Sequence, residues 1–177
     1  MSRRTLILGL AAIGAAAVGV GTGLRRFRES VDDAGAPEVS IDVWSLRFDA
    51  VDSAPIAMSA LRGRPLLLNF WATWCAPCVV EMPLLDRFAR AQGPHGWQVL
   101  ALAVDQPDPV RRFVAERALR LPVALAGVIG LDLSRRLGNS QGGLPFSVAF
   151  DRSGKAVQRH LGAVTEELLA AWQGTVA

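Results

Sequence analysis

A continuous apolar run just before the two cysteines places the strongest limit on how this chain can fold. Residues 64–72, RPLLLNFWA, have the length of a strand and the pattern of one buried on both faces of a sheet. A second run of this kind, WQVLALAVD, covers residues 97–105. The segment between them predicts a helix from about Ala76 to Ala91, which Pro83 should kink. This succession predicts an α/β fold.

The rest of the body alternates in the same way. We expect a helix with Asp108 as N-cap and Pro109 in its first position, running to about Arg120. Residues 41–48 alternate like a half-exposed strand. The other segments predict short elements: a strand and turn at 53–63, a strand at 122–126, a helix at 130–138, a hairpin of 145–151 and 155–162, and a closing helix at 165–173 capped by Thr165. Together they predict a mixed central sheet with helices on both faces.

The amino terminus predicts a membrane anchor or an export signal. Residues 5–24 carry no charge, follow Arg3 and Arg4, and would span about 30 Å as a helix. Their high alanine and glycine content favours a cleaved signal, whereas the arginines just after them oppose translocation. An uncleaved anchor and a cleaved signal both stay open, as do twin-arginine and general secretory export. Either one predicts a protein that works outside the cytoplasm.

Two further segments complete the expected organisation. Residues 25–40 combine mixed charge with helix breakers and predict a tether, and residues 41–177 predict one folded domain. The chain has a formal net charge of +3, but residues 1–28 carry five arginines and no acidic residue. The body is therefore slightly acidic overall, and its charge predicts no nucleic-acid partner.

The chain's two cysteines, Cys75 and Cys78, allow a redox pair, half of a metal site, a structural disulfide or an accident of spacing. Accident is a poor account, since two randomly placed cysteines would fall at this spacing in about one chain in 90. A zinc site needs about four ligands, and the two histidines, His95 and His160, lack the close spacing of a zinc finger. We expect both histidines to be ordinary solvated side chains. A structural disulfide would close only a tiny loop and add little stability. The pattern therefore favours a redox pair and no metal.

The position of the pair gives the redox interpretation a physical basis. Cys75 follows a buried strand, and Cys78 lies in the first turn of the next helix. The free N–H groups and the dipole at a helix amino end stabilise a thiolate, so we expect Cys75 to be the attacking sulfur. Cys78 is spaced to close the disulfide after a mixed-disulfide intermediate.

Two stretches, LLLNFWATWCAPCVVEMPLLDRF at 66–88 and GGLPFSVAFDRSGK at 142–155, resemble the thioredoxin-fold disulfide reductases of the TlpA/ResA type. The resemblance implies a thioredoxin-like fold with an amino-terminal β addition. It also implies an exported or anchored monomer, on the outer side of a bacterial inner membrane, that exchanges thiols with extracytoplasmic proteins, as in cytochrome c maturation. Its redox group would be the Cys75–Cys78 disulfide, with electrons from a membrane protein of the CcdA/DsbD kind.

The resemblance also assigns roles to further residues. It implies a cis peptide bond before Pro145, although an ordinary proline opening a strand is the alternative. The backbone at Leu144 would then pair with a substrate strand. Glu81, three residues after Cys78, would move the proton of that thiol if burial raised its pKa; a solvated helix glutamate is the alternative.

Four neighbours complete the expected site. Asn69 stands where thioredoxin has a buried aspartate, so it cannot titrate, and we expect an amide bonded to the backbone. Trp74 should belong to the contact surface with Trp71 packed beneath it, although both aromatic side chains would also suit a core. Pro77 suits an early helical position.

The direction of exchange stays open at the level of sequence. Reduction potential depends on the relative stability of the dithiol and the disulfide, and the Ala76-Pro77 dipeptide only biases it. The resemblance favours a reductant. A disulfide-forming oxidase and a binding module without turnover are the alternatives.

Overall fold

The computed structural model describes residues 42–176. The predicted anchor at 5–24 and tether at 25–40 lie outside the described residues. Within 42–176 no helix has the length and apolar character needed to cross a bilayer.

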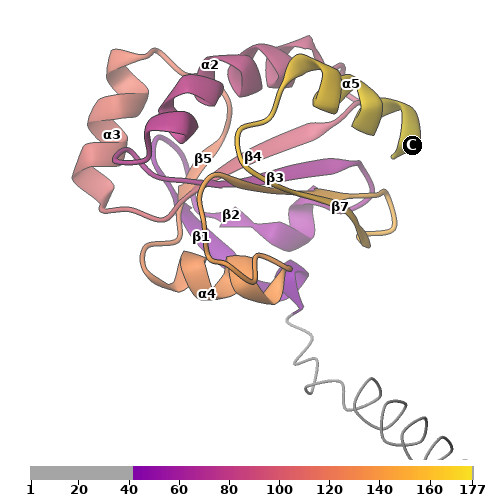
Figure 1. Cartoon of the computed structure of the whole chain (residues 1–177), viewed down its shortest axis with the longest axis horizontal. Helices are drawn as coiled ribbons and strands as arrows, with labels where there is room; N and C mark the ends of the chain where they lie inside the picture. Colours follow the sequence, from indigo (N-terminus) through magenta and orange to yellow (C-terminus); the bar gives the residue numbers. More distant parts are fainter. Residues whose placement is uncertain (1–41, 177) are drawn as a thin grey trace, which may run out of the picture. The chain divides into compact units, whose positions relative to one another are not determined.

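The described residues form a seven-stranded mixed sheet with the order β2-β1-β5-β4-β3-β6-β7 (Figure 1). Strands β3, β4 and β5 are parallel, and each remaining neighbouring pair is antiparallel. The short pair β1–β2 extends one edge, which confirms the predicted amino-terminal β addition. The strands are β1 (Arg47–Ala50), β2 (Ile56–Ala57), β3 (Leu66–Trp71), β4 (Gln98–Ala103), β5 (Val123–Leu125), β6 (Phe146–Phe150) and β7 (Ala156–Leu161).

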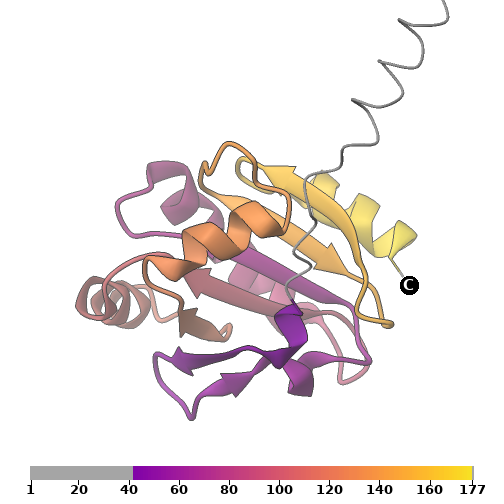
Figure 2. The ribbon, with the colours of Figure 1, turned by 90° about the horizontal axis from the view of Figure 1, so that it is seen from below.

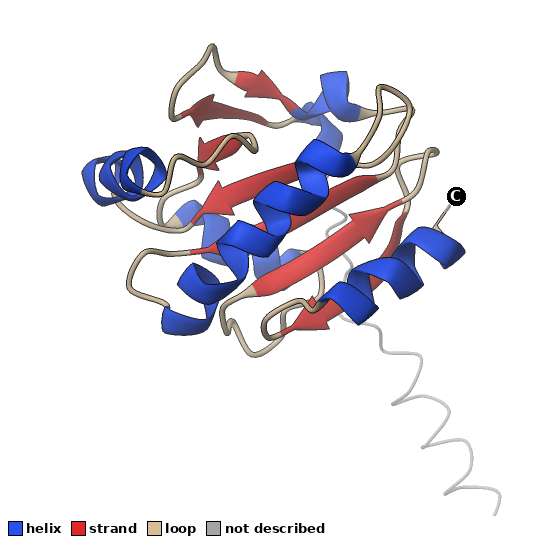
Figure 3. Cartoon of the chain, turned by 90° about the horizontal axis from the view of Figure 1, so that it is seen from above, coloured by secondary structure: helices blue, strands red, loops and turns tan. Residues whose placement is uncertain are grey.

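Helices cover both faces of the sheet, as predicted. Helices α2 (Ala76–Ala91), α3 (Pro107–Glu116) and α5 (Glu166–Thr175) lie on one face (Figures 1 and 3). Helix α4 (Ile129–Arg136) crosses the other face (Figure 2), together with the 3-10 turns η1 (Val43–Ser45) and η2 (Met58–Leu61).

Strand β3 divides the apolar core into two layers because its side chains alternate between the faces. Leu67 and Trp71 pack with the layer under α2, whereas Leu66, Leu68 and Phe70 pack with the layer under α4. All six residues of β3 are buried, as expected for a central strand covered on both sides. Asn69 shares the face of Leu67 and Trp71, so its polar side chain points toward α2.

The predicted strand at 41–48 is wrong in its first half, where the chain forms η1. The Asp42 side chain accepts a hydrogen bond from the Trp44 amide at 3.1 Å, which starts the turn. The Trp44 indole then donates to Gly154 O at 2.9 Å and packs edge-on against Phe150. A long-range contact thus overrides the alternating pattern, and β1 begins only at Arg47.

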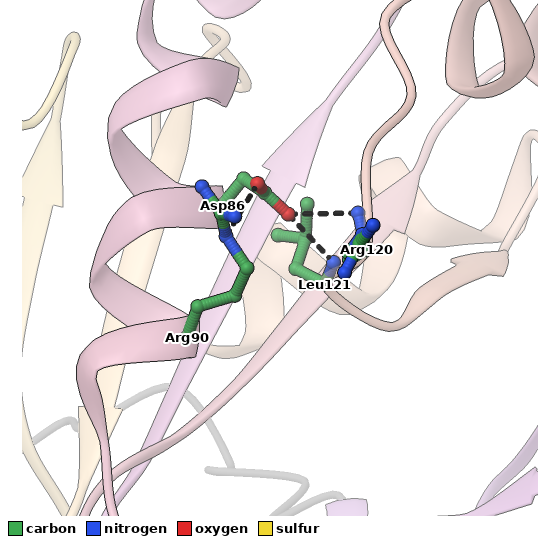
Figure 4. Close-up of polar contacts among 4 residues, drawn as sticks. All are labelled: Asp86, Arg90, Arg120 and Leu121. Carbon is green, nitrogen blue, oxygen red and sulfur yellow. Dashed lines mark hydrogen bonds and ion pairs between the residues drawn. The ribbon is translucent and has the colours of Figure 1, made fainter.

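The helix expected from Asp108 to Arg120 is also shifted. Its N-cap is Gln106, whose amide donates to Asp105 Oδ1 at 2.7 Å, and the helix ends at Glu116. Figure 4 shows the contacts that hold the chain after this helix. Asp86 Oδ1 on α2 accepts the amides of Arg120 and Leu121 at 2.7 and 2.9 Å, and Asp86 Oδ2 pairs with Arg90 at 3.1 Å. This buried carboxylate draws the turn before β5 onto α2.

The other elements agree with the sequence to within a few residues. Helix α2 has the predicted ends and continues through Pro83. Strands β6 and β7 form the predicted hairpin. Thr165 caps α5 by accepting the amide of Leu168 at 3.2 Å.

Candidate active site

The two cysteines lie at the amino end of α2, directly after the loop that follows β3. Cys75 is the N-cap, and Cys78 lies in the first turn. They form a disulfide, and the Cys78 amide donates to Cys75 Sγ at 3.3 Å. Cys75 is 6% exposed and Cys78 is 0% exposed. Of the two cysteines, only Cys75 keeps any exposed surface.

The loop before Cys75 is anchored by a carboxylate that sequence reasoning missed. Asp105 Oδ2, just after β4, accepts both the amide and the hydroxyl of Thr73, at 2.8 and 2.5 Å. The available signal was the adjacency of β3 and β4: parallel neighbours end at the same edge of a sheet. Pro77 occupies the early helical position predicted for it.

Glu81 is buried rather than solvated, so the solvated alternative is wrong. It is 3% exposed and stands one helical turn after Cys78. Its Oε1 accepts from Asn69 Nδ2 at 2.9 Å, and its Oε2 accepts from the Val164 amide at 2.7 Å. Burial raises the pKa of Glu81 to about 7, although both hydrogen bonds act in the opposite direction.

Asn69 is fully buried, as expected, but its partners are side chains rather than backbone groups. Its Nδ2 donates to Glu81 Oε1 and to Ser147 Oγ, the latter at 3.0 Å. Ser147 is the direct cross-strand neighbour of Asn69 on β6. The Asn69 Oδ1 atom has no hydrogen-bond partner. Sequence reasoning missed Ser147 because an isolated serine in an apolar strand carries no local signal.

A cis-proline lies at the end of the sheet where the cysteine loop begins. The predicted cis peptide bond is present between Leu144 and Pro145, at the start of β6. The Pro145 carbonyl accepts the amide of Gly162 at 2.9 Å. Because β6 runs antiparallel to β3, its first residues lie beside the end of β3 from which the cysteine loop departs.

An exposed aromatic side chain stands directly before Cys75 in the chain. Trp74 is 69% exposed, as a contact residue would be, and it lines a cleft of about 470 Å³ with Val104 and Val128. Trp71 is fully buried with its ring 5.2 Å from that of Phe113, so it fills the core.

The two histidines differ in their surroundings. His95 is exposed in the loop after α2, as predicted. His160 is half-buried, and its Nε2 lies 3.2 Å from Ala163 O, so it is not a simple solvated side chain. Among residues 42–176, no three His, Cys, Asp or Glu side chains gather closely enough to hold a metal ion.

A disulfide of this spacing at a helix amino end, on a sheet of this order and beside a cis-proline, defines a thioredoxin-fold thiol–disulfide exchange protein. The family model described as Redoxin matches residues 31–171. Thiol-disulfide oxidoreductase ResA of Bacillus thuringiensis (strain Al Hakam) is 33% identical over 122 residues, which are 67% of either chain. The ResA of Geobacillus kaustophilus (strain HTA426) is 31% identical over 113 residues, or 62% of either chain.

Solved structures agree with this class. A thioredoxin-related protein from Neisseria meningitidis serogroup B matches with a TM-score of 0.62 and 27% identity, over 71% of this chain and 93% of that one. A thioredoxin-family thiol:disulfide interchange protein from Chlorobium tepidum TLS matches with a TM-score of 0.64 and 25% identity. The match covers 75% of this chain and 92% of that one. The chain belongs to the Redoxin family and is a thiol-disulfide oxidoreductase of the ResA kind.

Proposed function

We propose that this oxidoreductase reduces disulfides of exported proteins outside the cytoplasm. The observation that carries the proposal is the unequal placement of the pair: Cys75 caps α2 and keeps 6% of its surface exposed, whereas Cys78 is fully buried. This arrangement suits one attacking and one resolving sulfur. The resemblance to reductases of the TlpA/ResA type favours reduction over oxidation.

In the first step the Cys75 thiolate attacks one sulfur of the substrate disulfide. A bond forms between Cys75 Sγ and that sulfur, and the substrate S–S bond breaks. The second substrate sulfur leaves as a thiolate and takes a proton from water. The amino end of α2 stabilises the attacking thiolate, since the Cys78 amide already points at Cys75 Sγ.

In the second step Cys78 resolves the mixed disulfide. The Cys78 thiol gives its proton to the Glu81 carboxylate, and the resulting thiolate attacks Cys75 Sγ. The bond between Cys75 and the substrate breaks, so the substrate leaves reduced and the enzyme keeps the Cys75–Cys78 disulfide. The burial of Glu81 and its pKa of about 7 support this role, because a general base works best near the ambient pH.

The substrate would bind as an extended segment across the cis-proline. Leu144 offers its backbone for strand pairing, and Pro145 leaves the groove open beside Cys75. The exposed Trp74 would cover an apolar side chain of the bound segment. Asn69 would support the site through its hydrogen bond to Glu81. Pro77 would shape the start of α2, and Trp71 would fill the core beneath the site.

The electron supply and location follow from the same resemblance. A membrane protein of the CcdA/DsbD kind would reduce the Cys75–Cys78 disulfide after each turnover. Residues 5–24 would anchor or export the chain, and residues 25–40 would tether a monomeric domain at the outer side of the inner membrane. The resemblance to the TlpA/ResA type favours cytochrome c maturation as the process in which the protein acts.

The reduction potential of the full-length protein tests the direction of exchange. It is measured by equilibration with glutathione or dithiothreitol buffers, with thiol trapping as the readout. A potential near that of thioredoxin, about −270 mV, is expected for a reductant. A potential near that of DsbA, about −120 mV, would make the protein a disulfide-forming oxidase instead.

A further inference from the structure

A single peptide group joins the buried carboxyl of Glu81 to His160 on strand β7. The N–H of the Ala163–Val164 peptide donates to Glu81 Oε2 at 2.7 Å. The carbonyl oxygen of the same peptide lies 3.2 Å from His160 Nε2. Because a carbonyl oxygen can only accept, His160 Nε2 carries a hydrogen in this arrangement. Glu81 and His160 therefore hold the two ends of one peptide unit.

The loop that contains this peptide is fixed at its start as well. Gly162 donates its amide to the carbonyl of Pro145 at 2.9 Å. Gly162 has a φ of +114°, and a Cβ placed there would lie 3.6 Å from His160 Nε2. The left-handed backbone favours glycine and turns the chain so that the next carbonyl meets the imidazole. The loop from Gly162 to Val164 therefore contacts the cis-proline, His160 and Glu81 in succession.

Hydrogen bonds in series strengthen one another inside a protein. A donor on a peptide carbonyl polarises that peptide and makes its N–H a better donor. Because an N–H bond to a carboxylate favours the ionised form, the hydrogen bond of His160 reaches Glu81 through the peptide.

We propose that His160 is a positioning residue for Glu81: its Nε2–H fixes and polarises the Ala163–Val164 peptide, whose N–H holds the carboxylate. This inference rests on the proposed role of Glu81 in exchange only where it concerns turnover. The hydrogen bond from His160 favours the carboxylate form of Glu81, which is the form that accepts the Cys78 proton. His160 would thereby extend the exchange reaction toward lower pH.

Other groups around Glu81 do not compete for this role. Strands β3 and β6 carry no titratable side chain, and Cys78, on the helix of Glu81, is held in the disulfide. The titratable or charged side chains on the neighbouring elements are bonded elsewhere or face water: Asp86, Arg87, Arg90, Arg159, Glu166 and Glu167.

The test follows the ionisation of Glu81 in the oxidised full-length protein, whose cysteines do not titrate, by ¹³C NMR of the side-chain carboxyl. In wild type we expect a carboxyl midpoint near 7. His160→Ala should move this midpoint upward. The expected shift is about 0.5 pH unit, because the carboxylate loses a polarised donor. His160→Gln keeps an N–H donor at this position, so its midpoint should stay at that of wild type.

The second histidine supplies a matched control. His95→Ala changes an exposed loop residue and should leave the Glu81 midpoint where it is in wild type. An unchanged midpoint in His160→Ala, or a midpoint in His160→Gln that departs from that of wild type, would overturn the inference. The Gln variant keeps the test open if the Ala variant does not fold.

Turnover separates this inference from the proposed function. If the midpoint moves and the pH profile of disulfide exchange moves with it, both are supported. If the midpoint moves but the exchange profile stays where it is in wild type, the link between His160 and Glu81 stands. The proposed role of Glu81 in exchange then fails.

Discussion

Asn69 Nδ2 lies 2.9 Å from Glu81 Oε1 and 3.0 Å from Ser147 Oγ, so one neutral amide joins β3, α2 and β6. Thioredoxin has an aspartate at the position of Asn69. In this protein the amide cannot take a proton, so the carboxyl of the buried cluster comes from α2 instead. The titratable carboxyl group therefore lies on α2, the helix that carries Cys78, and not on β3.

Replacing Asn69 by aspartate should place two carboxyl groups at hydrogen-bond distance in a buried site. They cannot both ionise, so one would stay protonated well above pH 7. We expect disulfide exchange at pH 7 to fall about tenfold and its pH profile to move upward. Stopped-flow rates between pH 5 and 9 measure this. A profile identical to wild type would show that Asn69 does not contact the titrating group in solution.

Glu81→Gln should remove the proton acceptor while keeping the fold. The introduced amide finds a partner in Asn69 Oδ1, which has none in wild type, after rotation of the Asn69 side chain. We expect the resolving step to slow at least tenfold. The same rate for both proteins in single-turnover experiments would remove Glu81 from the mechanism.

The stability of the oxidised protein should depend on pH through Glu81. Its folded pKa of about 7 lies above the ordinary value of 4.5, so the folded state holds the proton more tightly. The contribution is therefore present below pH 4.5 and is lost as the pH rises toward 7. The loss amounts to at most about 3 kcal/mol. Urea unfolding at pH 4.5 and 8 should show this loss in wild type and a flatter dependence in Glu81→Gln.

The two cysteine variants should behave differently. Cys75→Ser removes the attacking sulfur and should abolish turnover. Cys78→Ser removes the resolving sulfur and should accumulate a mixed disulfide at Cys75. Mass spectrometry without reductant, on protein incubated with a disulfide-bonded peptide, detects the adduct. Normal turnover by Cys78→Ser would contradict the proposed sequence of steps.

Asp86→Ala should destabilise the protein without touching its redox chemistry. The change leaves the amides of Arg120 and Leu121 without their acceptor and removes the ion pair with Arg90. We expect a loss of about 2–4 kcal/mol. Asp132→Ala, which breaks an exposed pair with Arg136, should cost less than about 1 kcal/mol. Equal losses in urea unfolding would show that burial does not distinguish the two carboxylates.

Trp74→Ala should weaken the binding of protein substrates. The side chain is 69% exposed, so its removal should change stability little. We expect KM for a disulfide-bonded protein to rise severalfold, while the rate with oxidised glutathione stays near wild type. Val80→Ala, an exposed residue on α2, serves as the comparison. If the rates with the protein substrate and with oxidised glutathione fall equally, Trp74 affects the reactivity of the cysteines rather than the binding of the protein substrate.

Much of the site could be predicted from local patterns. An apolar run followed by a cysteine pair and a helix start predicted β3, the cysteine positions and the limits of α2. Hydrogen bonds from side chains decided what local patterns could not. Asp42 and Trp44 turned a predicted strand into η1, and Asp86 holds residues 120 and 121, where a helix end was predicted, on α2.

The sequence by itself determined the buried strands, the cysteine pair at a helix start and the family, because each depends on neighbouring residues or on a contiguous motif. Only the tertiary structure decided that Glu81 is buried and held by Asn69 and Val164, and that His160 reaches it through one peptide. These residues are far apart along the chain. The pKa of a carboxyl depends on how much water is excluded and which donors converge on it, and both depend on how β3, β6, α2 and the loop before α5 pack together.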